Sequence, residues 1–377
     1  MMTHRQRVEA AMNFEPTDRL PTALGGGPYG IVDELYKGLL DYFALGDPVS
    51  PFRMGHNISY MDDRVLDCLN TDVRYVYPTL SPSSPSTRGS DADTFLDAFG
   101  QVWKRAVPYY FAGKGMLEDI DSVEQINSLV SWPDPNDSRW FSETHIRAKH
   151  LKENTDCWIT ARMAVSHGPF QYASDLRGME KFLMDMLSQP NLAGALIEKI
   201  GDVYCGLYEN YMRSCGNYID MIELPGDDYA GNKSLIISPG MFREFIKPVV
   251  KRVINAIRAV RPDIKIMLHS DGAIEKLIPD LIEMGVDVLH PLEPLEAVDQ
   301  AAIKQKYCDQ IVFLGGVNIT QALRGSRDRV LEEVERVIKA LALGGGYIFA
   351  PSNHLQQDIP PENVVLLFNA ARDRSAS

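Results

Sequence analysis

Apolar positions in the second half of the chain alternate between two spacings. Short runs of consecutive apolar residues are followed by polar turns and then by segments with an apolar residue at every third or fourth position. The short runs predict buried strands, and the longer periodic segments predict helices with one buried face. Between residues 218 and 291 the predicted strands are 218–224, 264–268 and 286–289, and the predicted helices begin at Ser238-Pro239 and span 273–284.

The same alternation extends over most of the chain and predicts eight strands. Strands that alternate with helices form parallel sheets, and eight such units close into a (β/α)8 TIM barrel. No linker or internal repeat interrupts the pattern, so we predict a single domain over residues 1–377. The remaining predicted strands are 19–24, 72–77, 158–165, 311–314 and 347–350, and helices are predicted at 3–12, 122–129, 179–188 and 192–214.

Residues 30–150 depart from the regular pattern. This N-terminal helical and loop excursion contains a Ser/Pro-rich loop at 79–90 and a small hairpin at 95–104. Long insertions in a barrel often line or cover its binding site. We therefore expect the region to form a cap over the barrel mouth, although a cover with no role in the site would give the same pattern.

Polar side chains follow three consecutive predicted strands. Asp227 and Asp228 follow strand 218–224, and His269 and Asp271 follow strand 264–268. The C-terminal ends of barrel strands carry the catalytic groups, so we predict catalytic roles for these four residues. Local roles are the alternatives, because aspartate is common in turns and at helix N-termini and a histidine can be purely structural.

Other turns on the same predicted face carry aromatic, amide and imidazole side chains. The three histidines are equally consistent with buried rings that bond the backbone, and the aromatic residues with core packing. The Gly25-Gly26-Gly27 run lacks the spacing of a phosphate-binding fingerprint. The predicted substrate-binding residues are His167, Phe170, Tyr229, His290, Asn318 and His354.

Composition excludes several classes of partner. The chain of 377 residues carries a net charge of −13, which disfavours nucleic acid and anionic membranes. It has neither a run of about eighteen apolar residues nor the apolar core of a signal peptide. The five cysteines are scattered without metal-type spacing, which is typical of reduced thiols, so we expect a cytoplasmic protein.

A series of short motifs extends over nearly the whole chain. In order they are Asp18-Arg19-Leu20-Pro21, Trp132-Pro133-Asp134-Pro135, Gly168-Pro169-Phe170, Gly226-Asp227-Asp228, Ser238-Pro239, His269-Ser270-Asp271-Gly272, His290-Pro291 and Gly345-Gly346-Tyr347. Their order resembles the uroporphyrinogen decarboxylase superfamily. This resemblance implies a (β/α)8 barrel, in agreement with the strand count. The superfamily contains decarboxylases and methyltransferases that act with corrinoid proteins.

Two departures bear on the reaction. True uroporphyrinogen decarboxylases resemble one another in an arginine-rich N-terminal segment, whereas residues 21–29 here contain no arginine. A substrate with many carboxylates needs guanidinium partners. Thiol-methylating members hold zinc with a His-x-Cys pair and a later Cys. The corresponding residues here are His269, Asp271 and the pair Asn353-His354. The resemblance thus implies zinc ligated by His269, Asp271 and Asp227, with Asp228, His290 or His354 as further ligands.

We therefore expect a methyltransferase component that moves a methyl group from a small O-methyl compound, such as a methoxylated aromatic, to a corrinoid protein. The corrinoid would be carried by that partner protein, and a homodimer is compatible with the sequence. One alternative is a metal-independent decarboxylase (a lyase) of a carboxylated substrate. Another is a non-catalytic ligand-binding barrel.

Overall fold

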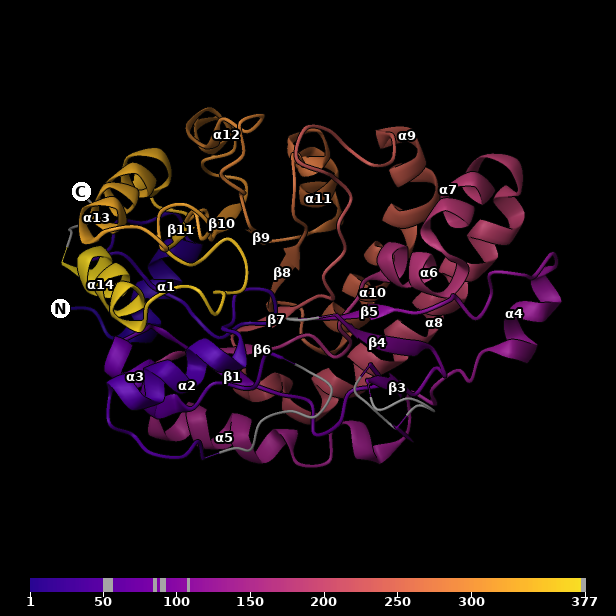
Figure 1. The fold of residues 1–377 in the computed structure, drawn as a ribbon, viewed down its shortest axis with the longest axis horizontal. Helices are drawn as coiled ribbons and strands as arrows, with labels where there is room; N and C mark the ends of the chain where they lie inside the picture. The colour runs from indigo at the N-terminus through magenta and orange to yellow at the C-terminus, as the bar shows by residue number, and fades with distance from the viewer. Residues whose placement is uncertain (50–56, 84–86, 89–92, 107–108, 374–377) are drawn as a thin grey trace.

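The computed structural model describes residues 1–49, 57–83, 87–88, 93–106 and 109–373. Within these ranges the chain forms a seven-stranded parallel sheet, curled on itself and surrounded by helices, and a separate four-stranded antiparallel sheet (Figure 1). Parts of the predicted Ser/Pro-rich loop, residues 84–86 and 89–90, lie outside the described residues.

The parallel sheet follows chain order, as a (β/α)8 barrel requires. Each strand pairs with its neighbours in the order β1-β6-β7-β8-β9-β10-β11. Seven of the eight predicted strands are therefore confirmed in place and order, although most are shorter than predicted. Their bounds are β1 Val73–Val76, β6 Trp158–Ala161, β7 Met221–Glu223, β8 Lys265–His269, β9 Val288–His290, β10 Val312–Leu314 and β11 Tyr347–Ile348.

The predicted strand 19–24 closes the barrel without forming a regular strand. Its Ala23 N–H donates to the Phe349 carbonyl oxygen at 2.9 Å, and the Phe349 N–H donates to Pro21 at 2.8 Å. On the other side, the Asp72 N–H donates to the Thr22 carbonyl oxygen at 2.9 Å. Pro21 has no N–H, and the Thr22 N–H donates to the Asp72 carboxylate, so a continuous ladder cannot form.

The helices pack outside the strands (Figure 1). The predicted helices at 3–12, 122–129, 179–188 and 192–214 are confirmed to within two residues at each end. The helices are α1 His4–Met12, α2 Asp33–Tyr42, α3 Asp63–Leu69, α4 Val123–Leu129, α5 Thr144–Asn154, α6 Pro169–Arg177, α7 Met179–Ser188, α8 Pro190–Cys215, α9 Pro239–Met241, α10 Lys247–Val260, α11 Ile278–Met284, α12 Gln300–Lys306, α13 Arg327–Val337 and α14 Pro361–Arg372. Short 3₁₀ turns occur at Ser138–Trp140, Gly216–Tyr218 and Glu275–Leu277, and π-helical turns at Phe242–Ile246 and Ile338–Ala342.

Prolines change two of the predicted helices. The helix that Ser238 caps runs without a break through residues 239–260, but it contains a π-helical turn at Phe242–Ile246 between α9 and α10. Pro248 lacks an N–H, and its ring would clash with the carbonyl of the residue four positions earlier, so an ordinary α-turn cannot form there. Pro279 acts in the same way on the helix predicted at 273–284, which becomes a 3₁₀ turn followed by α11.

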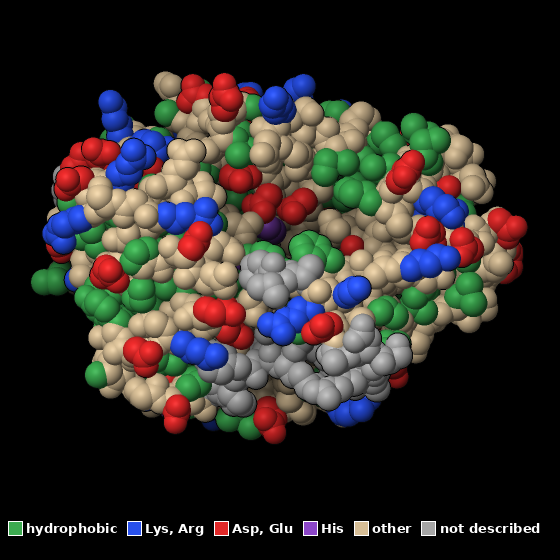
Figure 2. Space-filling model, in the orientation of Figure 1, with side chains coloured by type: hydrophobic (Ala, Val, Ile, Leu, Met, Phe, Trp, Pro, Cys, Tyr) green, Lys and Arg blue, Asp and Glu red, His purple; other side chains and the backbone are tan. Residues whose placement is uncertain are grey.

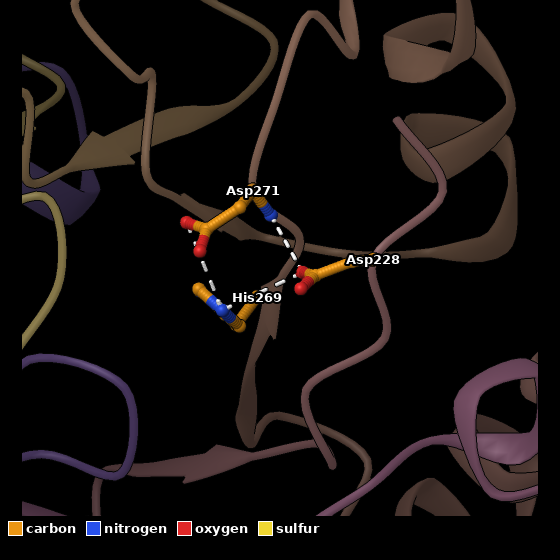
Figure 3. A group of neighbouring side chains, drawn as sticks. All are labelled: Asp228, His269 and Asp271. Carbon is orange, nitrogen blue, oxygen red and sulfur yellow. Dashed lines mark hydrogen bonds and ion pairs between the residues drawn. The ribbon is translucent and has the colours of Figure 1, made fainter. Parts of the chain in front are cut away.

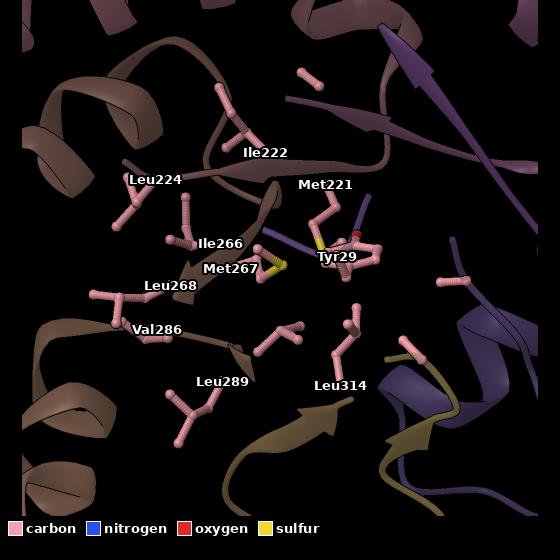
Figure 4. Close-up of a cluster of buried hydrophobic side chains, with 14 of the residues drawn as sticks. Tyr29, Met221, Ile222, Leu224, Ile266, Met267, Leu268, Val286, Leu289 and Leu314 are labelled. Carbon is pink, nitrogen blue, oxygen red and sulfur yellow. The ribbon is translucent and has the colours of Figure 1, made fainter. Parts of the chain in front are cut away.

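The interior of the barrel is mostly apolar, and the buried Glu223 of β7 is an exception. Side chains from β7, β8 and β10 meet around Tyr29, including Met221, Met267 and Leu314 (Figure 4). All of these side chains are at most 1% exposed. Burial of this kind stabilises the fold by about 1.5–3 kcal/mol for each large side chain. The packed interior leaves the ends of the strands as the place for a binding site.

The antiparallel sheet forms the predicted cap. It consists of β2 Thr87–Arg88, β3 Thr94–Leu96, β4 Val102–Ala106 and β5 Tyr109–Ala112, paired in chain order. The predicted hairpin at 95–104 is confirmed as the β3–β4 pair. Side chains of β3, β4 and β5 line the large cavity described below, so this sheet covers the barrel mouth. Within the described ranges, no helix combines the length and the apolar character needed to cross a bilayer.

Candidate active site

A cavity of about 960 Å³ opens at the C-terminal ends of the parallel strands. Figure 2 shows it as a hollow near the middle of one face, with acidic side chains and a histidine at its wall. Aromatic side chains of the antiparallel sheet form the opposite wall. This is the size and polarity expected of a site for a small organic ligand. The aromatic residues at the cavity are Tyr60, Phe95, Trp103, Tyr109, Tyr110 and Phe111.

Asp228, His269 and Asp271 converge at this cavity (Figure 3). One possible ligand atom from each lies within 4.8 Å of the other two. The His269 Nε2 atom is 3.7 Å from Asp228 Oδ1 and 3.9 Å from Asp271 Oδ1. The Asp271 N–H donates to the Asp228 carboxylate at 2.8 Å, which fixes the two loops relative to each other. We refer to these three residues as the acidic triad.

The orientation of His269 is set by a chain of hydrogen bonds behind it. The His290 Nε2 lies 3.0 Å from the Pro351 carbonyl oxygen, which can only accept, so Nε2 carries a hydrogen. Burial lowers the pKa of His290 well below 6.5, so the ring is neutral and its Nδ1 accepts. The His269 Nδ1–H donates to that atom at 2.9 Å. A neutral His269 then presents the Nε2 lone pair to the two carboxylates.

Asp271 is poorly neutralised by its surroundings. Its Oδ2 accepts a hydrogen bond from Asn353 Nδ2 at 2.6 Å, whereas its Oδ1 is buried and has no hydrogen-bond partner. Burial raises the pKa of Asp271 to about 7, opposed by His269 and reinforced by Asp228 and Glu293. A 3₁₀ turn begins only at Glu275, so the alternative role of Asp271 as a helix cap is not observed.

The acidic triad fits a divalent cation. A nitrogen lone pair and an unpaired buried carboxylate oxygen face each other, and both are ligand atoms that zinc accepts. Three protein ligands leave a coordination position for a substrate atom. The second nitrogen of the ligand histidine is held by another group, as is usual at metal sites.

Asp227 does not join the triad. Its carboxylate accepts hydrogen bonds from the N–H groups of Phe170 at 3.1 Å and Gln171 at 2.7 Å, in the first turn of α6. The Tyr229 hydroxyl donates to it at 3.0 Å. Burial raises the pKa of Asp227 to about 7, against these hydrogen bonds. The structure thus corrects the predicted ligand set, because Asp228 rather than Asp227 faces His269. Asp227 instead anchors α6 to the turn after β7.

The anchor explains the Gly168-Pro169-Phe170 motif. A Cβ atom on Gly168 would lie 2.4 Å from the Cβ and Cγ atoms of Asp227, so only glycine allows the carboxylate to reach the helix. The Gly25-Gly26-Gly27 run has a similar reason. A Cβ atom on Gly27 would lie 2.3 Å from Met163 Cε and 2.7 Å from Glu223 Oε2. Close packing, and no phosphate cradle, accounts for these glycines.

His167 lines the cavity as part of a dyad. Its Nδ1 lies 2.7 Å from Asp175 Oδ2, and its backbone carbonyl accepts a hydrogen bond from Tyr204. Burial by itself lowers the pKa of His167, but the Asp175 carboxylate together with Asp227 and Asp228 outweighs burial and raises the pKa above 6.5. The ring also meets Trp103 of the cap sheet edge-on, with centroids 5.2 Å apart. A protonated imidazole can therefore face the ligand near neutral pH.

The other predicted substrate-binding residues divide into two groups. Asn318 and His354 line the cavity. The His354 Nε2 donates to the Gly27 carbonyl oxygen at 2.8 Å, and burial lowers the pKa of this ring to about 4. In contrast, Phe170, Tyr229 and His290 are fully buried and lie behind the cavity wall. Their predicted contact with substrate is corrected to supporting positions behind the wall.

Several cavity residues were missed in the sequence. These are Asp175, Glu293 and Arg162. Asp175 lies in α6, the helix that follows His167, and Arg162 lies just after β6. Glu293 accepts a hydrogen bond from the Gly272 N–H at 2.8 Å. Two of these left a sequence signal. Glu293 closely follows the predicted strand 286–289, although no role was predicted for it. Arg162 is a charged residue inside an otherwise apolar run predicted to be a buried strand, and such a residue needs a partner.

Comparison with known proteins gives a consistent family. Residues 120–374 match the family model described as "Uroporphyrinogen decarboxylase (URO-D)". The uroporphyrinogen decarboxylase of Chlorobium limicola is 22% identical over 213 residues, which cover 55% of this chain and 57% of that relative. The enzyme of the same name from Chlorobaculum tepidum is 21% identical over 270 residues, covering 70% of this chain and 73% of the relative. The first match thus spans little more than half of that relative's length.

A solved structure extends the comparison to the whole fold. A methyltransferase from Methanosarcina mazei superposes with a TM-score of 0.69 over 98% of both chains, at 18% sequence identity. At this identity the likeness establishes the shared barrel fold alone.

Proposed function

Because the chain belongs to the uroporphyrinogen decarboxylase family, we propose that it is the methyltransferase component of a corrinoid-dependent system. It would take a methyl group from a small methyl ether, such as a methoxylated aromatic, and pass it to a corrinoid carried by a separate protein. One barrel domain over residues 1–377, with a cap at about residues 30–150, is part of the same proposal.

The acidic triad is the observation that carries the proposal. Its nitrogen and oxygen atoms suit a hard or borderline cation, and neither cysteine ligand of the thiol-methylating members is present. A zinc ion held by Asp228, His269 and Asp271 would supply Lewis acidity at an ether oxygen. Neighbouring residues orient the atoms that would bind the zinc ion: His290 holds His269, and Asn353 holds Asp271.

The cavity provides the remaining groups that cleavage of an ether needs. The aromatic wall can stack a methoxylated ring, and the cap sheet excludes water from it. His167, protonated by its pairing with Asp175, can give a proton to the oxygen that loses the methyl group. Each of these roles can be tested by substituting the residue concerned.

A methyl acceptor from outside the chain is consistent with the cavity. Among the described residues that line it there is no cysteine, and the four other acidic or imidazole groups are poor methyl acceptors. The hollow through which the cavity reaches the surface beside the cap sheet would give a partner protein access. The corrinoid partner and the zinc ion both belong to this proposal.

Decarboxylation of a smaller carboxylated substrate is the second candidate. The curated relatives named above favour it, and the raised pKa of Asp271 would suit an acid catalyst without a metal. Uroporphyrinogen itself is disfavoured. Arg162 and Arg324 are the guanidinium groups among the described residues at the cavity, whereas Asp175, Asp228, Asp271 and Glu293 are acidic.

The experiment is a demethylation assay with free cob(I)alamin as the acceptor and 4-methoxybenzoate as the substrate. We expect zinc-loaded protein to release the phenol, and His269→Ala to lose both zinc and activity. Asp227→Asn is the control, because Asp227 lies next to Asp228 in the chain but is not part of the triad. This variant should keep its zinc. Demethylation by zinc-free protein, or carbon dioxide release without demethylation, would contradict the proposal.

A further inference from the structure

Arg162 is a buried cation at the wall of the cavity. It follows β6 directly, is 6% exposed and lines the cavity beside Gly27 and Met163. A buried charge is unfavourable unless a group of opposite charge compensates it. If the protein does not supply the opposite charge, a bound ligand can supply it.

The protein compensates Arg162 only weakly. Across the described ranges, no carboxylate oxygen lies within 4.0 Å of its guanidinium. Its single hydrogen bond runs from Nη2 to the Gly27 carbonyl oxygen at 3.5 Å, and that oxygen already accepts a shorter bond from His354. The nearby Glu223 is fully buried, with its Oε2 accepting from the Gly27 N–H and its Oε1 without a hydrogen-bond partner. Its carboxylate attracts Arg162 electrostatically but forms no ion pair with it, so it compensates the cation only in part. The other guanidinium N–H groups have no partner among the described residues.

Two tyrosines hold the guanidinium in place without neutralising it. Arg162 lies 5.1 Å from the ring centroid of Tyr60 and 5.9 Å from that of Tyr77. These rings stack on each other at 3.8 Å. Stacking on aromatic faces orients the planar fork and leaves its N–H edges available. Such an edge matches the two oxygens of a carboxylate.

Arg324 provides an internal comparison. It also lines the cavity, but it is paired with Asp358 at 2.7 Å and its side chain is 42% exposed. Its charge is therefore compensated by the protein and by water. Arg162, in contrast, has neither an ion-pair partner among the described residues nor substantial exposure to water.

Adjacent residues connect Arg162 to the acidic triad. His354 donates to the Gly27 carbonyl beside Arg162, and Asn353 donates to Asp271 of the triad. Arg162 and the three triad residues line the same cavity, so a single small aromatic molecule held there would have its anionic end at Arg162 and its other end toward the triad.

We propose that Arg162 binds a carboxylate of the substrate, so that the cavity selects an aromatic acid over its neutral analogues. The assignment of the opposite end of this acid to a methyl ether rests on the proposed function, whereas the carboxylate site does not.

The test is calorimetric binding to the purified, zinc-loaded full chain. The probes are 4-methoxybenzoate, 4-methoxybenzamide, and the benzoate and benzamide that lack the ether. Wild type is expected to bind each acid about 10- to 100-fold more tightly than its amide, as one charge-assisted pair contributes. Arg162→Met should remove this preference and leave amide binding unchanged. Arg324→Met, the matched control, should retain the preference.

Equal affinity of wild type for acid and amide would overturn the assignment without any substitution, as would an absence of binding of every probe. Preference that survives in Arg162→Met, with an unchanged thermal unfolding curve, would also overturn it. If wild type prefers the acids but does not demethylate 4-methoxybenzoate, the proposed function is wrong and the carboxylate site stands. If wild type demethylates 4-methoxybenzoate but shows no preference for the acids, the carboxylate site is wrong and the proposed function stands.

Discussion

The Nδ1 atoms of His269 and His290 lie 2.9 Å apart, at paired positions of the neighbouring strands β8 and β9. The strand register therefore brings the two rings together, and the Pro351 carbonyl fixes which nitrogen carries each hydrogen. His290 is thus a positioning residue for His269.

The first prediction concerns this pair. His290→Phe keeps the ring volume but removes the acceptor for His269, so zinc affinity should fall about 10- to 100-fold. A competition titration with a chromophoric chelator measures it. Tyr29→Phe is the control, because Tyr29 packs against the His290 ring at 4.9 Å and the loss of its hydroxyl leaves the His290 acceptor nitrogen in place. Equal zinc affinity of His290→Phe and wild type would contradict the positioning role.

The second prediction separates the two adjacent aspartates. Asp228→Asn should lower zinc content and leave the unfolding free energy nearly unchanged, since its side chain is 43% exposed. Asp227→Asn should keep zinc but reduce the unfolding free energy by about 1–3 kcal/mol, because an amide nitrogen cannot accept from the α6 N–H groups. Elemental analysis and urea unfolding provide the two readouts. The opposite pattern would restore Asp227 as the ligand.

The third prediction is the pH dependence of the His167–Asp175 contact. The folded-state pKa of His167 is raised, so the contact stabilises fully below the ordinary pKa of about 6.5 and loses this contribution as pH rises through the folded-state pKa. The destabilisation caused by Asp175→Asn should therefore be larger at about pH 6 than at about pH 9. Urea unfolding at the two pH values tests this. NMR titration should also place the pKa of His167 above 6.5 in wild type and lower in the variant. The same destabilisation at both pH values would refute the pairing.

The fourth prediction concerns the glycine under Asp227. Gly168→Ala should destabilise the protein by about 1–3 kcal/mol, because the added methyl group overlaps Asp227. Gly231→Ala is the matched control. Its nearest non-neighbouring atom would be 3.9 Å from the new Cβ, so the change should stay within about 0.5 kcal/mol. Thermal unfolding of both variants compares them, and equal melting temperatures would disprove the tight contact.

The barrel could be predicted from the sequence because apolar spacing is a local property. The helix starting at Ser238 shows the limit, since its apolar face is confirmed while Pro248 imposes a π-helical turn that spacing does not register. The segment 19–24 was identified as a strand, yet its ladder is interrupted by Pro21 and by the side chain of Asp72. Such interruptions depend on single atoms and not on a pattern.

The candidate site was predictable only in part. His269 and Asp271 follow one strand and could be placed at its end, and the structure brings them together. Asp227 and Asp228 are adjacent, and successive residues of an extended segment point to opposite sides, so sequence could not decide which one faces the cavity. His290 was expected to meet substrate, but it is the last residue of β9 and supports His269. That Arg162 has no ion-pair partner among the described residues could be seen only in the three-dimensional structure.

The bond between His354 and Gly27 joins residues 327 positions apart in the chain. The same two regions close the sheet, where Thr22 bridges to Phe349. During synthesis, the early segment must wait for β11 to leave the ribosome before it can take its place. Contacts between such distant residues are slow to form. The seam that closes the barrel is therefore among the last parts to form, and a translation product that ends before β11 would lack both this seam and the part of the cavity that His354 lines.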